Sequence, residues 1–122
     1  MKRIFSLLLI CTALLSMSAC KKDPSVAKVF VRSQNNQLMT GAQVVIIADR
    51  VGNESDIEYV DTLLTNSSGY VEFMMDEYFS QTGESITVGT FDVICKKLDF
   101  EGTGRIRCRK NNTAVETIYI FE

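Results

Sequence analysis

The sequence predicts an all-β protein: a single antiparallel β-sandwich of seven short strands that follows an N-terminal signal segment. Three observations support this prediction. Several runs alternate polar with apolar residues, or are rich in β-branched residues, as strands are. Turn residues recur about every eight to twelve residues, a spacing typical of sandwiches. After the leader, no stretch has the convincing periodicity of a helix.

The N-terminal residues 1–19 have the three parts of a secretory signal. Lys2 and Arg3 give a positive start, residues 4–15 are apolar, and residues 16–19 form a cleavage region rich in small side chains. A transmembrane helix is the alternative, but an apolar run of about twelve residues is well short of the roughly 20 that cross a bilayer core. Removal of the leader would leave a chain the size of one domain.

Cys20 directly follows this leader. The residues Met17-Ser18-Ala19-Cys20 resemble a bacterial lipobox, with methionine where leucine is more usual. The resemblance implies that Cys20 is acylated and ties the protein permanently to a membrane through several acyl chains. An ordinary cleaved signal without lipid is the alternative. Residues 20–27, which contain the only proline, would then be a short polar tether.

The remaining residues 28–122 form the predicted domain, and its first half reads as four strands. Lys28–Arg32 alternates polar and apolar residues, whereas Ala42–Ala48 is apolar on both faces and predicts a central, fully covered strand. Ile57–Thr65 and the return strand Tyr70–Met75 flank the turn Asn66–Gly69, whose glycine supplies a positive φ.

The second half predicts three more strands. Asp76–Ser85 suits a long loop or one helical turn, and we expect a loop. Thr87–Leu98 is a strand, Glu101-Gly102 a turn, and Arg105–Arg109 and Ala114–Phe121 the last two strands.

Two cysteines of the predicted domain allow a test of strand register. If Glu101-Gly102 is a two-residue hairpin loop, facing residues have numbers that add to 203, as those of Cys95 and Cys108 do. Both cysteines would also point to the apolar inner side. In an oxidising cell envelope this arrangement predicts a Cys95–Cys108 disulfide. Two buried free thiols are the alternative, because a longer turn would shift the register.

The same alternation places Arg105, Arg107 and Arg109 on the outward face of their strand, with Lys96 across the hairpin. Arginines arranged in this way could bind a carboxylate, a phosphate or an acidic sugar through forked contacts. The alternative is a solvated strand face whose charge blunts an exposed edge.

Composition excludes several classes of function. The chain has 13 basic and 15 acidic side chains, and losing Lys2 and Arg3 with the leader lowers the net charge from −2 to −4. Nucleic acid is therefore not an expected partner. The chain has no histidine, the commonest general base and metal ligand. We expect no cofactor, no metal and no enzymatic activity.

Three segments carry a resemblance to a known family. Gly41–Val44, Thr65–Phe73 and Gly89–Val93 are similar to the second strand, the turn with its return strand, and a Gly-x-Tyr-x-Val segment of carboxypeptidase regulatory-like domains. That family has a transthyretin-like, immunoglobulin-like sandwich without catalysis. Transthyretin-like hydroxyisourate hydrolases depend on histidines that this chain lacks. Lys21-Lys22-Asp23 also resembles the export tag of Bacteroidetes surface lipoproteins.

These resemblances imply a lipoprotein of the bacterial outer membrane, on its periplasmic or cell-surface side, anchored through Cys20. Its sandwich would act as a binding or scaffold module whose partner is another envelope protein or a glycan. A subunit of an envelope-spanning secretion machine is the first alternative, and an enzyme of unknown type is the less favoured one.

Overall fold

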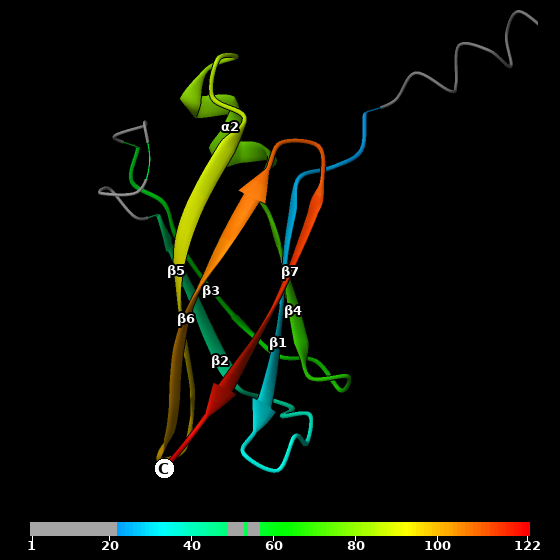
Figure 1. Ribbon diagram of the computed structural model, residues 1–122, viewed down its shortest axis with the longest axis vertical. Helices are drawn as coiled ribbons and strands as arrows, with labels where there is room; N and C mark the ends of the chain where they lie inside the picture. Colours follow the sequence, from blue (N-terminus) through cyan, green and yellow to red (C-terminus); the bar gives the residue numbers. More distant parts are fainter. Residues whose placement is uncertain (1–21, 49–52, 54–56) are drawn as a thin grey trace, which may run out of the picture.

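The computed structural model describes residues 22–48, 53 and 57–122, and these form two sheets and one short helix (Figure 1). The prediction of an all-β fold is confirmed. The elements in chain order are β1 (Val26–Ser33), β2 (Gln43–Ala48), β3 (Val60–Leu64), β4 (Tyr70–Met74), α2 (Asp76–Thr82), β5 (Val88–Lys97), β6 (Phe100–Arg109) and β7 (Thr113–Ile120).

The strands are arranged in a three-stranded sheet A, of order β4-β1-β7, and a four-stranded sheet B, of order β3-β2-β5-β6. Every neighbouring pair is antiparallel except β1 and β7, which are parallel. The prediction of a wholly antiparallel fold is therefore wrong for sheet A. Parallel neighbours need a long connection, and the rest of the domain supplies it, because β1 is the first strand and β7 the last.

One apolar core lies between the two sheets. Alternate residues of every strand except the edge strand β3 point into it, as the period of two requires, and Val29 of sheet A and Val44 and Phe91 of sheet B are fully buried. Strand β2 is central, as predicted, but Val45 and Ile47 on its outer face are only half-buried. The expectation that this strand is fully covered is wrong, because no described segment of the chain forms a layer over sheet B at that position.

The segment predicted as a loop contains the seven-residue helix α2. Met75, the residue at the N-cap position, makes no side-chain capping hydrogen bond, and a helix this short is unstable alone in water. Tyr78 and Phe79 explain its presence, since both are buried and their rings meet edge to face, with centroids 5.3 Å apart. Tertiary burial of two aromatic side chains therefore overrides the weak local signal.

The β5–β6 hairpin turns earlier than predicted. Lys97 pairs with Phe100, so the loop is Leu98-Asp99, and Leu98 adopts a positive φ of 54°. The predicted turn residue Gly102 instead lies within β6, opposite Cys95. The hairpin is thus shifted by six residues from the predicted register. Because six is even, the residues predicted to face inward still do so.

This register rules out the predicted disulfide. Cys95 lies opposite Gly102 and Cys108 opposite Gly89, and both thiols are free and buried. Cys108 is six residues along β6 from the partner of Cys95, about 20 Å at 3.3 Å per residue. A disulfide needs Cα atoms closer than about 7 Å. The alternative of two buried free thiols is the one that the structure bears out.

The two sheets are joined by backbone hydrogen bonds where the start of β6 meets the residue after β7. Glu101 and Phe121 exchange backbone hydrogen bonds of 2.9 and 2.8 Å across this joint. Gly102 packs directly under β7, since a Cβ atom added there would lie 2.1 Å from the backbone oxygen of Tyr119. The missing side chain allows the two strands to cross.

Thr65 joins the β1–β2 loop to the end of β3 through its side-chain hydroxyl. Its buried hydroxyl donates to the Met39 carbonyl at 2.6 Å and accepts from the Ala42 amide at 2.8 Å. Thr65→Val should lower the free energy of unfolding by about 1–3 kcal/mol, because it leaves both backbone groups unpaired. Urea unfolding measures the loss. The exposed Thr62→Val is the control and should change it by less than about 0.5 kcal/mol; equal effects would contradict the prediction.

Candidate functional site

The three arginines of β6 point outward, as predicted. Arg105, Arg107 and Arg109 are exposed and alternate with buried Ile106 and Cys108. On the neighbouring strand β5 they lie opposite Asp92, Thr90 and Val88, respectively. We call this row the β6 arginine face.

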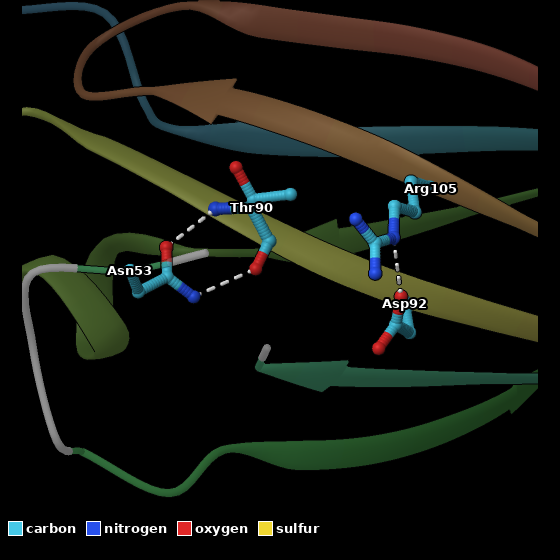
Figure 2. Close-up of polar contacts among 4 residues, drawn as sticks. All are labelled: Asn53, Thr90, Asp92 and Arg105. Carbon is cyan, nitrogen blue, oxygen red and sulfur yellow. Dashed lines mark hydrogen bonds and ion pairs between the residues drawn. The ribbon is translucent and has the colours of Figure 1, made fainter. Parts of the chain in front are cut away.

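One of these arginines is already paired. The Nε atom of Arg105 lies 2.9 Å from Oδ1 of Asp92, as Figure 2 shows. Both side chains remain substantially exposed, and such a pair contributes at most about 1 kcal/mol to stability. The pairing reduces the positive charge that the β6 arginine face can offer a ligand.

Lys96 does not belong to this face. It lies opposite Glu101, with its Nζ atom 3.3 Å from Oε1 of that residue. The predicted register would have placed it opposite Arg107, and the six-residue shift moves it to the far end of the hairpin. Lys96 points outward, as its alternation predicts, but the prediction that it lies across the hairpin from the arginines is wrong.

Arg107 and Arg109 form no ion pair within the described part of the chain. Arg107 lines an open hollow of about 500 Å³ beside β5, whose walls also include Asn53, Thr87 and Thr90. Arg107 and Arg109 together line a smaller hollow of about 290 Å³ next to the β6–β7 turn. Their guanidinium groups could donate hydrogen bonds to an anion there, but both hollows are open to solvent.

Asn53 is a polar contact that the sequence did not predict. Its side-chain amide donates to the Thr90 carbonyl at 2.8 Å, and its Oδ1 accepts from the Thr90 amide at 2.7 Å (Figure 2). Strand β2 pairs with β5 only as far as Ala48 and Phe91. The Asn53 side chain therefore continues the backbone pairing of β5 by one residue, next to the Arg107 hollow.

A substitution at Asn53 tests this contact. Asn53→Ala should raise the hydrogen-exchange rate of the Thr90 amide at least about tenfold, because it removes the side-chain oxygen that accepts from this amide. Exchange followed by NMR measures the rate. Asn35→Ala makes the same truncation at an exposed loop position and should leave this amide unchanged; equal acceleration in both variants would contradict a direct contact.

The two cysteines of the domain are chemically quiet. Burial away from water raises the pKa of Cys95 to about 12 and that of Cys108 to about 12, because desolvation disfavours the thiolate. Both thiols are therefore protonated near neutral pH, and their inward position keeps them from reagents. They serve as small apolar core residues.

Other kinds of site are not found in the described residues. Within residues 22–48, 53 and 57–122, no group of three acidic, cysteine or histidine side chains is placed to hold a metal ion. The helix in this part of the chain is too short and too polar to span a membrane. Cys20 lies outside the described residues, so its acylation stays a prediction. Comparison of the sequence with protein-family models and with curated proteins finds no match.

Proposed function

We propose that the chain is a lipoprotein anchored in the bacterial outer membrane through Cys20, and that it presents a non-catalytic, transthyretin-like β-sandwich as a binding or scaffold module of the cell envelope. The proposed partner is another envelope protein or a glycan. Two features support the proposal: the lipobox-like sequence at Cys20, and the start of the folded domain only a few residues after it.

The observation that carries the proposal is the fixed position of Ser25. This residue is fully buried, its carbonyl accepts from the Met75 amide at 2.8 Å, and its amide donates to Oδ1 of Asp76 at 3.0 Å. Its hydroxyl accepts from the Asn111 amide at 2.7 Å. The folded domain therefore begins at Ser25, and the chain cannot swing freely from that point onward.

A short tether gives the domain a defined end toward the membrane. Five Cα–Cα steps join Cys20 to Ser25, which limits their separation to about 18 Å. One end of the domain carries α2 and the β6–β7 turn (Figure 1). An acyl anchor on Cys20 would hold this end close to the bilayer. The C-terminus and the β5–β6 hairpin lie at the opposite end. The outer faces of both sheets would then lie on the sides of the domain and not be turned toward the bilayer, so that a partner could reach them.

The lipid anchor is tested by a pair of cysteine substitutions. Cys20→Ser should remove the lipid mass and release the protein from washed membranes almost completely, since no acyl chain can then form. Intact mass spectrometry and membrane fractionation measure these effects. Cys11→Ser, inside the leader, should leave both unchanged. The proposal fails if the Cys20→Ser protein still carries lipid or stays with the membrane to the same extent.

A further inference from the structure

The outer face of sheet A carries the chemistry of a binding surface, although the sequence patterns pointed to sheet B. Register places Phe30 of β1 beside Tyr70 of β4, and Arg32 of β1 beside both Tyr119 of β7 and Leu38. Paired residues of neighbouring strands project from the same face. These side chains, together with Lys28, form what we call the sheet A platform.

The sheet A platform combines exposed side chains with a pair of half-buried aromatic rings. Tyr119 is 44% exposed and Leu38 45% exposed. The rings of Phe30 and Tyr70 are half-buried and tilted, with centroids 5.3 Å apart. An exposed aromatic side chain next to other aromatic and apolar side chains is more informative than a scattered apolar one, because it marks a place where a ligand can cover it.

Two cations lie among these rings. The Nζ atom of Lys28 lies 4.2 Å from the centroid of the Tyr70 ring, and Nη1 of Arg32 donates to the carbonyl and to Oδ1 of Asn36, both at 3.2 Å. Neither cation forms an ion pair within the described residues. Glu72, which is paired with Lys28 in the register, is the only acidic residue that the described parts of β1, β4 and β7 place on this outer face. The platform is thus net positive on a net negative chain.

The charge argues against a second copy of the chain as the occupant. Packing two platforms face to face would bring together two surfaces of the same net positive charge, and like charges disfavour such a contact. A negatively charged ligand with flat apolar faces suits the platform better. Sugar rings have such faces, since their C–H groups carry positive partial charge that the negative face of an aromatic ring attracts.

We infer that the sheet A platform binds an anionic oligosaccharide, with sugar faces stacked on Tyr119 and carboxylates held by Arg32 and Lys28. This inference rests on the proposed function, because it names the partner that the anchored module would hold. The partner would bind on the side of the domain. The short tether would hold the α2 end of the domain at the membrane, so the outer face of sheet A would not be pressed against the bilayer.

The test uses the full-length chain, solubilised from membranes in detergent, and titration calorimetry with oligogalacturonate. Tyr119→Ala and Arg32→Gln should each weaken binding about tenfold, the scale of one stacking or charge-assisted contact. Ile94→Ala on the outer face of sheet B, where the side chain is 41% exposed, should bind as the parent does. The methyl-esterified oligosaccharide, which keeps the sugar and loses the charge, should bind at least about tenfold more weakly.

The inference is overturned if oligogalacturonate does not bind, if Tyr119→Ala binds it as tightly as the parent, or if the methyl ester binds equally well. Binding of a protein at this face, with no binding of the oligosaccharide, overturns it as well. These outcomes are separate from the lipid test. A chain that carries lipid on Cys20 but binds no oligosaccharide contradicts only this inference, whereas a chain without lipid contradicts the proposed function.

Discussion

Gly102→Ala is expected to lower the free energy of unfolding by at least about 3 kcal/mol, or to prevent folding. The added Cβ would lie 2.1 Å from the Tyr119 backbone oxygen, a distance that no contact tolerates. Since the obstacle is backbone rather than a mobile side chain, β7 would have to move and the hydrogen bonds between Glu101 and Phe121 would be strained. Urea unfolding monitored by circular dichroism gives the change.

Gly104→Ala is the matched control on the same strand. Its Cβ would lie 2.3 Å from Cδ1 of Ile118, which is the end of a flexible side chain and can change rotamer. The expected loss is below about 1.5 kcal/mol. The difference between the two variants isolates the backbone contact at Gly102. A loss for Gly102→Ala as small as that for Gly104→Ala would show that β6 and β7 separate easily there.

Alkaline pH is expected to destabilise the domain steeply through Cys95 and Cys108. Their ordinary pKa of 9.0 is raised to about 12 in the fold. Below pH 9 both thiols are protonated in the folded and unfolded states, so their full contribution to stability is present. Between about pH 9 and 12 only the unfolded state loses these protons. The free energy of unfolding should then fall by about 1.4 kcal/mol per pH unit for each thiol.

Denaturant unfolding at several pH values between 8 and 11 measures this slope. Lysine and tyrosine side chains also titrate in this range, so the double variant Cys95→Ala/Cys108→Ala supplies the background. Its stability should decline by about 2.7 kcal/mol less per pH unit than that of the parent, the sum for two thiols. Parallel curves for parent and variant would contradict the buried, protonated state of the cysteines.

The strands and their inward faces could be predicted because the period of two is a local property of the chain. Val29, Val44 and Cys108 point into the core as their alternation requires. The hairpin register could not be predicted in the same way. The sequence predicts a glycine turn at Gly102, but Leu98 is the residue that adopts the positive φ. A non-glycine residue at such a position gives no composition signal.

Glycine has two structural roles in this domain, and Gly102 and Gly69 are examples of each. Glycine marks turns because it tolerates a positive φ, but it also allows two backbones to approach closely. Gly69 serves the first purpose, with a φ of 75°, and its turn was predicted correctly. Gly102 serves the second, because the Tyr119 backbone lies against it. Only the arrival of β7, from the far end of the chain, distinguishes the two.

The candidate sites differ in the same way: some follow from the pattern within one strand, and others depend on how distant strands meet. The β6 arginine face was predicted because its members alternate within one strand, whereas Lys96 was misplaced because its position depends on the hairpin register. The sheet A platform had no local signal. Its rings come from β1, β4 and β7, which are distant in the sequence and meet only because β1 lies between the other two.

By itself, the sequence determined an all-β domain behind a lipobox-like Cys20, the inward direction of alternating residues such as Val29, Val44 and Cys108, and the Gly69 turn. Only the tertiary structure decided the parallel pairing of β1 with β7, the helix α2, the free state of Cys95 and Cys108, and the grouping of aromatic and basic side chains on sheet A. The physical reason is range. Alternation and positive φ act between neighbouring residues, whereas register, burial of a short helix and close backbone approach depend on segments that meet only in the folded state.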